Sequence, residues 1–442
     1  MKKLLTVLIA FLMTLSAQAK APKCDFNAVI NDSGVDKNSI AISIKDLGSG
    51  KPVYQLNEKI LMHPASVQKA LTLIPAVEVL GEDYEFTTEI YQRGDDNYII
   101  KLGADPYLTT SDLKKLVSDV NIEAKKVLID DSILEKKSWG EGWQWDDDMN
   151  VLMPKFNSYN LDRNLIKITV VPTQKGQTAS IINPSKYPIV FLNNVVTGDK
   201  NNVQISRDDS ISSNTLALNG TVNKPVTMYI PTNNLKRYFD IRLTNVLQDR
   251  KIYLKQNFVF GSVTPDDKIL DKVTHPLSNA IDDILKNSNN MVSETVAKLA
   301  GGKAYNDRGT DLNGIKVFNA YCEKLGLDNS KIRITDASGV SKNNLISADF
   351  ISEYFVKNKN NKVLEHLPKP GEGTLTHRML PLKDNLRAKT GTHGDASSIA
   401  GFLTTKNGHK LAFCIIINDT TSTIADMKTL EDYLIREAYM RL

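Results

Sequence analysis

Ser66 and Lys69 are the residues of this chain whose types and spacing could do chemistry. The preceding Pro64 favours a helix that begins at the serine. Residues three apart share one face of a helix, so the lysine amine can reach the serine hydroxyl. A neutral lysine could take the hydroxyl proton and leave a nucleophilic alkoxide. The helix N-terminus would add free backbone N–H groups that point at the group under attack.

The Ser-x-x-Lys pattern is weak by itself, because it recurs at Ser111 and Lys114. That second serine follows two threonines, and a helix-capping serine is the better interpretation of it. Two short patterns further along the chain distinguish Ser66 from Ser111.

The first of these patterns is Ser-x-Asn, formed by Ser288 and Asn290 inside a stretch of helical periodicity over 276–299. Its structural interpretation is that Ser288 caps a helix beginning near Met291. In a catalytic site, the serine hydroxyl could instead relay a proton to a leaving amine, while Asn290 hydrogen-bonds a substrate amide.

The second pattern is Lys389-Thr390-Gly391, followed by Thr392 and by a predicted strand over 398–403. The lysine offers a cation for a substrate carboxylate and the threonine offers a hydroxyl group. The glycine would let a substrate backbone approach the edge of the strand. Taken alone, such a tripeptide is more often an ordinary strand end.

The stretch 139–148 is unusually rich in tryptophan and aspartate. It is either a solvated loop with its aromatic rings packed beneath it, or the wall of a site that binds a cationic or zwitterionic group.

Composition excludes several classes of protein. A length of 442 residues predicts two or three domains. The hydrophobic content of 41% and charged content of 24% are typical of globular proteins. A net charge of +4, without a clustered Lys/Arg run, argues against nucleic-acid binding. The three cysteines form neither a disulfide framework nor a metal-binding pattern, so we expect no metal site. The predicted chemistry also needs no cofactor.

The N-terminal segment resembles a secretory signal. Lys2 and Lys3 precede an apolar run over 4–15, and Ala17-Gln18-Ala19 fits a cleavage site. The apolar run is shorter than the ~20 residues that a membrane span needs. We therefore expect export to the periplasm, a mature chain that begins near Lys20, and a protein that is soluble or loosely attached to the membrane.

The elements that must position these residues are predicted from periodicity. A helix is expected over 66–80, with Pro75 removing one hydrogen bond and bending its second half. Further helices are predicted over 276–299, 310–325 and 424–442, and strands over 39–44, 98–102, 126–129, 166–171 and 411–417.

The three motifs, in this order, resemble the signature of penicillin-binding proteins and serine β-lactamases. The distance between the first two is too long for a β-lactamase, and a large inserted region would fill it. This arrangement resembles the class C low-molecular-mass penicillin-binding proteins, the D-Ala-D-Ala carboxypeptidase/endopeptidase family. Departures from the family are Pro75 and Ala104. Other stretches similar to the family's are 80–88, 103–108, 130–132, 142–147, 336–339 and 373–379.

The resemblance implies an α/β (α+β) fold in which an antiparallel sheet is flanked by helices and interrupted by an inserted α/β domain with a small β-rich domain. The implied divisions are a signal peptide at 1–19, a catalytic domain at 20–88 and 262–442, an inserted domain at 89–170 and 226–261, and a β-rich insertion at 171–225.

The resemblance also implies catalytic roles. Ser66 would be acylated and Lys69 would be its base, a role that burial and the nearby charge of Lys389 would favour. Ser288 would pass the proton onward and Asn290 would hold the peptide.

Binding roles follow in the same way. Lys389, Thr390, Gly391 and Thr392 would line the place of the substrate's terminal carboxylate. The backbone N–H groups of Ser66 and Thr392 would form the oxyanion hole. In family members from diderm bacteria, an acidic residue of the insertion contacts the diaminopimelate amine, and the nearest matches here are Asp147 and Asp148.

The sequence therefore predicts a serine DD-peptidase that hydrolyses peptidoglycan stem peptides and is acylated by β-lactams. The alternatives are a serine β-lactamase and a catalytically idle peptidoglycan-binding protein. A histidine-based triad through His63 or His393 ranks lower, because the lysine mechanism needs neither residue. The balance of carboxypeptidase and endopeptidase action, the third stem residue, cysteine pairing and the oligomeric state stay open.

Overall fold

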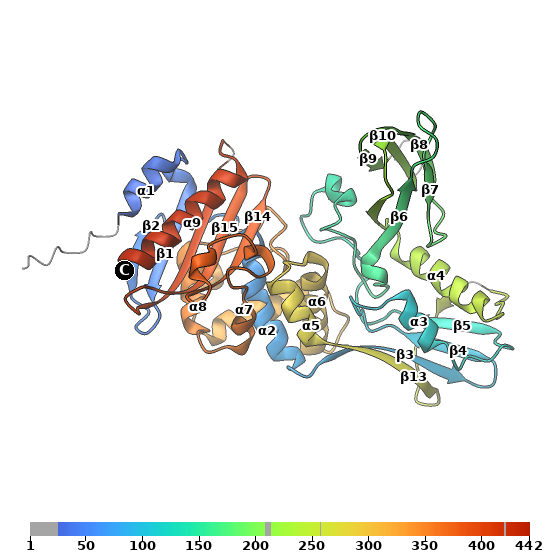
Figure 1. The fold of residues 1–442 in the computed structure, drawn as a ribbon. Coiled ribbons are helices and arrows are strands. Elements are labelled where there is room, and N and C mark those ends of the chain that lie inside the picture. Colours follow the sequence, from blue (N-terminus) through green and yellow to red (C-terminus); the bar gives the residue numbers. More distant parts are fainter. Residues whose placement is uncertain (1–24, 208–213, 257, 420) are drawn as a thin grey trace, which may run out of the picture.

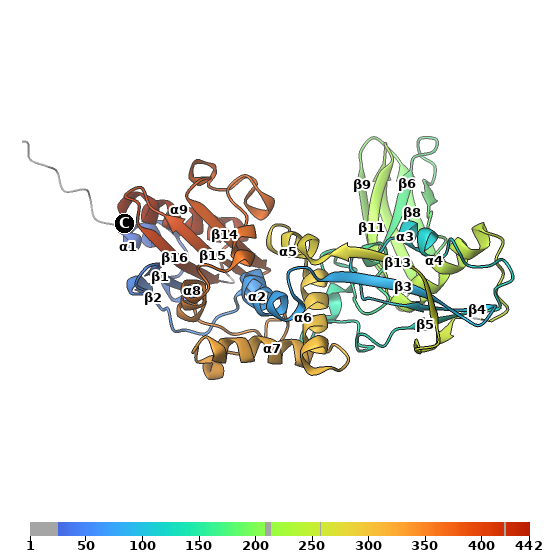
Figure 2. The ribbon, with the colours of Figure 1, turned by 90° about the horizontal axis from the view of Figure 1, so that it is seen from below.

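The computed structural model describes residues 25–207, 214–256, 258–419 and 421–442. The predicted signal segment and Cys24 lie outside these ranges. A helical and sheet-containing body built from both ends of the chain stands beside an outlying region formed by its middle (Figure 1). Two long paired strands, β3 and β13, run from the first body into the second (Figure 2).

The sheet of the first body joins the two ends of the chain. Its five antiparallel strands have the order β14-β15-β16-β1-β2. All side chains of β1 over 40–45 are buried, which requires that both faces of the sheet be covered. The strands are β1 (Ile40–Asp46), β2 (Pro52–Leu56), β14 (Leu386–His393), β15 (Ala396–Thr404) and β16 (Lys410–Asn418).

Helices cover the two faces. On one face, α1 (Phe26–Ser33) and α9 (Ile424–Arg441) close an apolar core. On the other face, a larger core lies beneath the remaining helices of this body. These are α2 (Gln68–Leu80), α5 (Leu277–Leu285), α6 (Asn290–Tyr305), α7 (Asp311–Lys324) and α8 (Ala348–Lys357).

Pro75 lies inside α2, which continues through it to Leu80. Because proline has no N–H, the carbonyl of Leu71 lacks its helical partner. The hydroxyl of buried Tyr354 donates to that carbonyl at 2.8 Å. A side chain from α8 thus replaces the missing hydrogen bond, and α2 keeps its position under the sheet.

The outlying region contains three sheets. A mixed sheet in the order β12-β5-β4-β3-β13 is covered by two helices, and two three-stranded sheets extend from it. The mixed sheet comprises β3 (Glu85–Arg93), β4 (Asn97–Lys101), β5 (Lys126–Asp130), β12 (Val259–Phe260) and β13 (Lys268–Pro276), with helices α3 (Thr110–Leu116) and α4 (Leu235–Asp249). The smaller sheets comprise β6 (Leu165–Val171), β7 (Ser180–Ile182) and β11 (Val226–Pro231), and β8 (Val190–Thr197), β9 (Asn202–Arg207) and β10 (Thr215–Val222).

Three local predictions were wrong. The periodicity over 276–299 belongs to two helices, α5 and α6, because the chain turns at Ser288, whose φ is 60°. The cap of α6 is Asn289, whose side chain accepts from the N–H of Val292. Thr109, rather than Ser111, caps α3.

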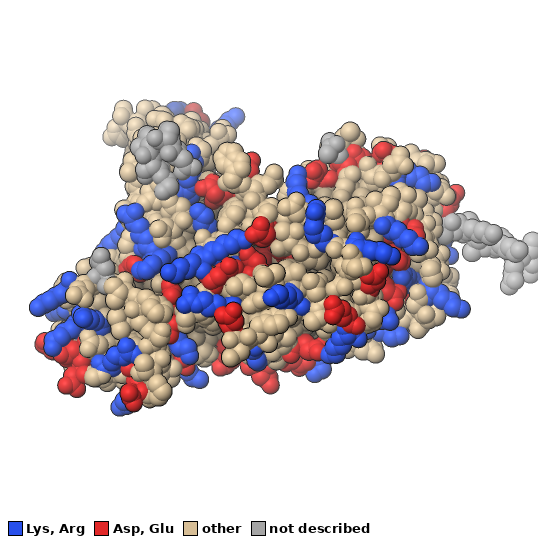
Figure 3. All heavy atoms as spheres, turned by 180° about the vertical axis from the view of Figure 1, so that it is seen from behind, with Lys and Arg blue, Asp and Glu red and all other residues tan. Residues whose placement is uncertain are grey.

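Among the described residues, no helix is both long enough and apolar enough to cross a membrane. On the face shown in Figure 3, basic and acidic side chains are intermingled rather than gathered by sign. This distribution agrees with the small net charge of the chain and differs from the basic stripe of a nucleic-acid-binding surface.

Candidate active site

Ser66 stands in a single 3₁₀ turn, η2 (Ala65–Val67), directly before α2. Ala65 has a φ of 45°, a left-handed conformation that is strained for a residue with a Cβ. The turn of Gly339 presses against it, since a Cβ at Gly339 would lie 2.0 Å from the Ala65 carbonyl oxygen. The turn therefore packs directly against the strained backbone, while the adjacent Ser66 is partly exposed.

The Lys69 amine is completely buried and donates three hydrogen bonds. Its Nζ lies 2.8 Å from Ser66 Oγ and 2.6 Å from Asn290 Oδ1. The third acceptor, at 2.7 Å, is the backbone carbonyl of Ser338. Burial lowers the pKa of Lys69 to about 7, while the carboxylates of Asp336 and Glu294 act in the opposite direction. At neutral pH, a substantial fraction of this amine can accept the serine proton.

A second lysine completes the group. Lys389 Nζ is also buried and donates to Ser288 Oγ at 2.9 Å and to the Thr390 carbonyl at 2.7 Å. Because Asn289 supplies the cap of α6, the Ser288 hydroxyl is left to face the lysine. Burial, and then the charge of Lys69, lower the pKa of Lys389 well below its usual range.

Strand β14 brings the Lys-Thr-Gly motif against the nucleophile. A Cβ at Gly391 would lie 2.8 Å from Ser66 N and 2.9 Å from the Pro64 carbonyl oxygen, so only glycine permits this approach. The hydroxyl of Ser398 donates to the same Pro64 carbonyl at 2.6 Å. Gly391 is buried and the next residue, Thr392, is exposed at the edge beside Ser66.

The acidic stretch 139–148 is a loop with one short helix, η3 (Trp145–Met149). Asp148 is not free there, because Arg207 Nε donates to its Oδ2 at 2.8 Å. Partial burial and the neighbouring Asp146 raise the pKa of Asp147, whereas His393 at the end of β14 lowers it. Of the two predicted aspartates, Asp148 is paired with Arg207 at the end of β9, and Asp147 is the one whose pKa His393 affects.

Sequence reasoning missed three groups around Lys69. Ser338 contributes a backbone carbonyl, which any residue type could supply, so the sequence gives no sign of it. Asp336 and Glu294 are buried carboxylates that accept backbone N–H groups of the turn at 336–341. The acidic residue in that turn was visible in the sequence, but its role required knowing where the turn lies. Burial and the charge of Asp336 raise the pKa of Glu294 to about 8.

Neither histidine near the site is bonded to Ser66 or Lys69 in the described hydrogen bonds. His63 Nε2 lies 3.1 Å from the Gly339 carbonyl, and its ring meets that of His393 edge-on at 5.3 Å. Burial lowers the pKa of His63 to about 4. The geometry therefore gives lysine, and not histidine, the place beside the serine.

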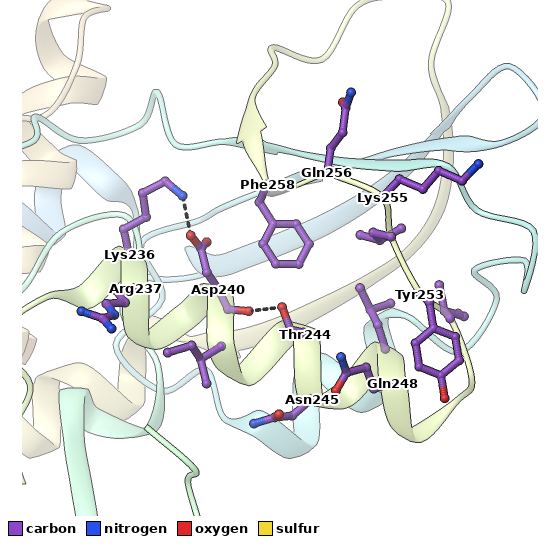
Figure 4. A pocket seen from close by; sticks show the side chains of 14 residues that line it. Lys236, Arg237, Asp240, Thr244, Asn245, Gln248, Tyr253, Lys255, Gln256 and Phe258 are labelled. Atoms are coloured by element: carbon purple, nitrogen blue, oxygen red, sulfur yellow. Dashed lines mark hydrogen bonds and ion pairs between the residues drawn. The ribbon is translucent and has the colours of Figure 1, made fainter. Parts of the chain in front are cut away.

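Elsewhere in the described residues, neither the pocket beside α4 nor any cluster of metal-binding side chains offers a comparable catalytic group. A hollow of about 840 Å³ lies between α4 and residues 252–256 and Phe258. It is lined by the Lys236–Asp240 ion pair and by Phe258, and no serine–lysine pair is among its residues (Figure 4). Within the described residues, no cluster of His, Cys, Asp and Glu could hold a metal ion.

A serine backed by a buried lysine, at the edge of a five-stranded antiparallel sheet with helices on both faces, defines a class: a serine hydrolase of the penicillin-binding type. Residues 23–436 match the D-Ala-D-Ala carboxypeptidase 3 (S13) family. The chain belongs to this family.

Individual relatives agree. The D-alanyl-D-alanine carboxypeptidase DacB of Haemophilus influenzae is 24% identical over 89% of this chain and 88% of its own. The crystal structure of penicillin binding protein 4 (dacB) from that organism matches with a TM-score of 0.81 and 22% identity, over 94% of this chain and 99% of its own. A second structure of it, in complex with a β-lactam, has a TM-score of 0.76 at the same identity and coverage. These structural likenesses show the fold.

Proposed function

We propose that this D-Ala-D-Ala carboxypeptidase/endopeptidase uses Ser66 as its nucleophile and Lys69 as the general base. The observation that carries the proposal is the 2.8 Å contact between Ser66 Oγ and the amine of Lys69, whose pKa burial lowers to about 7. Neutral Lys69 takes the hydroxyl proton as Ser66 Oγ attacks the carbonyl carbon of the D-Ala-D-X bond. The backbone N–H groups of Ser66 and Thr392 hold the developing oxyanion.

The leaving amine needs a proton when the C–N bond breaks. This is the proton that Lys69 removed from Ser66, and the Ser288 hydroxyl, held by Lys389 at 2.9 Å, passes it to the amine. The result is an ester at Ser66, which water hydrolyses to release the shortened peptide and restore the hydroxyl group. A β-lactam would acylate Ser66 in the same way. Its ester would be hydrolysed slowly, because the leaving amine stays tethered to the acyl group.

We propose that Lys389 and Thr390–Thr392 hold the terminal carboxylate of a peptidoglycan stem peptide, with Asn290 on the peptide amide. A bound carboxylate would favour the charged form of Lys389, whose pKa is lowered by burial and by the charge of Lys69. Asp147 is the candidate for the cationic amine of a diaminopimelate-type third residue, and Asp148 is the weaker candidate because Arg207 already pairs with it.

The location and the domain division are proposals of the same kind. The N-terminal signal pattern supports export to the periplasm, where this substrate lies. The catalytic domain would comprise 20–88 and 262–442, and the inserted domains would comprise 89–261, divided at 170 and 226.

The test is acylation of the purified mature protein by a fluorescent penicillin, compared with Ser66→Ala on a denaturing gel. We expect a persistent band in the wild type that disappears in the variant. Rapid loss of the drug without a band would favour a β-lactamase. Neither band nor drug loss, in folded protein, would refute the enzymatic mechanism and leave a binding protein. Purified muropeptides would then separate carboxypeptidase from endopeptidase activity.

A further inference from the structure

Two of the three hydrogen-bond acceptors of the Lys69 amine are connected by further hydrogen bonds to the tryptophan- and aspartate-rich stretch 139–148 or to the residues directly after it. The indole N–H of Trp143 donates to Asp336 Oδ2 at 2.8 Å, in the turn that carries the Ser338 carbonyl. Beyond the end of the stretch 139–148, in the segment that follows η3, the carbonyl of Leu152 accepts from Asn290 Nδ2 at 2.9 Å. The loop thus connects the catalytic lysine to the region in which Asp147 lies.

Asp336 organises the turn. Its side chain is 1% exposed and accepts from the backbone N–H groups of Gly339, Val340 and Ser341 at 2.8–3.0 Å. Glu294 accepts the N–H of Ser338 at 2.7 Å from the other side. The two peptide groups that flank Ser338 are thus held by Glu294 and Asp336, and in this arrangement the Ser338 carbonyl accepts from Lys69.

Trp143 is placed to supply one specific donor to this turn. Its side chain is 6% exposed, and its ring packs against Trp139 and Phe156 at centroid distances of 5.2 and 5.7 Å. The indole N–H is its only polar group, and a buried tryptophan keeps that group paired. A phenylalanine at this position could preserve the packing and would lose the hydrogen bond.

We propose that Trp143 is a positioning residue for acylation, which acts through Asp336 and the Ser338 carbonyl to hold the Lys69 amine against Ser66. The inference rests on the proposed function and deepens it. It assigns the aromatic part of the acidic loop to the catalytic lysine, in addition to any contact that the aspartates make with substrate.

The consequence of losing the N–H has a definite direction. Asp336 Oδ2 would lack one of its donors in a place closed to water, so the turn that carries the Ser338 carbonyl would loosen. A displaced Ser338 carbonyl would be a weaker acceptor for protonated Lys69. The other titratable groups beside this amine are Glu294, whose charged form acts in the same direction as that of Asp336, and Lys389, whose own pKa the charge of Lys69 lowers. The pKa of Lys69 should therefore fall further, and a weaker base, less well placed, should remove the serine proton more slowly.

The experiment compares Trp143→Phe with Trp139→Phe. Trp139 is a matched control, because its indole N–H donates to the Trp143 carbonyl at 3.3 Å and not to Asp336. The probe is a small fluorescent penicillin without an amine side chain, so that contacts of Asp147 with substrate do not enter. The second-order rate constant of acylation is measured from pH 5 to 9, together with the thermal midpoint of each protein.

We expect acylation of Trp143→Phe to be at least about tenfold slower at its plateau, the size associated with one hydrogen bond to a charged group. Its acid limb should move to lower pH, while Trp139→Phe stays within about twofold of the wild type with an unmoved limb. Equal plateaus and limbs in the two variants, or a loss that merely follows their thermal midpoints, would overturn the inference. Absence of labelling in the wild type would instead overturn the proposed function, so the two failures are distinguishable.

Discussion

Acylation of Ser66 should depend on pH with a midpoint set by Lys69. Burial lowers the pKa of this lysine to about 7, against 10.5 for the free side chain. The base must be neutral to accept the serine proton, so the rate constant should rise with pH. Each pH unit below the pKa reduces the neutral amine about tenfold. The rate constant should thus be half-maximal near pH 7, about one-tenth of its plateau at pH 6 and about one-hundredth at pH 5.

The assay is rapid-quench labelling with fluorescent penicillin, whose carboxylate stays ionised throughout this range. Ser66→Ala provides the blank, and far-UV circular dichroism at each pH confirms that the protein is folded. Lys69→Arg should be unlabelled at every pH, because a guanidinium does not lose its proton. His63 cannot produce this midpoint, since burial lowers its pKa to about 4, and His393→Asn should leave the midpoint unchanged.

A rate constant that is flat from pH 5 to 8 would refute the assignment of Lys69 as the base. A midpoint above pH 9 would refute it as well, because the amine would then be protonated in the working enzyme. A midpoint that moves with His393→Asn would transfer the role from the lysine to that histidine.

Asp147→Asn should lower turnover of diaminopimelate-containing peptides and leave labelling by an amine-free penicillin unchanged. Asp148→Asn should chiefly lower the thermal midpoint, because it breaks the ion pair with buried Arg207. Equal effects of the two variants on peptide turnover would contradict these separate roles. Lys69→Met tests how much burial of the Lys69 amine lowers the free energy of unfolding. Unfolding of the wild type takes up a proton between pH 7 and 10.5, so its free energy of unfolding should rise relative to the variant by up to about 1.4 kcal/mol per pH unit in that window. Urea titrations at pH 7 and 9 measure the difference, and a difference independent of pH would mean that the lysine is charged in the folded protein.

The sequence could predict the features that depend on residues close together in the chain. The spacing of Ser66 and Lys69 is set by one turn of helix, so their contact was predictable and is confirmed at 2.8 Å. The helix after them was predicted to bend at Pro75, and the structure shows a helix that continues through it. Its missing hydrogen bond is replaced by one from Tyr354, which lies 283 residues from Leu71 along the chain. No local pattern contains that information.

The same distinction explains the rest of the site. Ser288 looked like a helix cap because serine favours that position, but Asn289 takes the cap and a left-handed backbone at Ser288 splits the predicted helix in two. That exchange is what frees the Ser288 hydroxyl for Lys389. The acceptor at Ser338 is a carbonyl group, which every residue has, so its role depends entirely on the turn that Asp336 builds. Residue types thus name the groups that react, while the groups that hold Lys69 in place come from backbone geometry and buried carboxylates brought together only by folding.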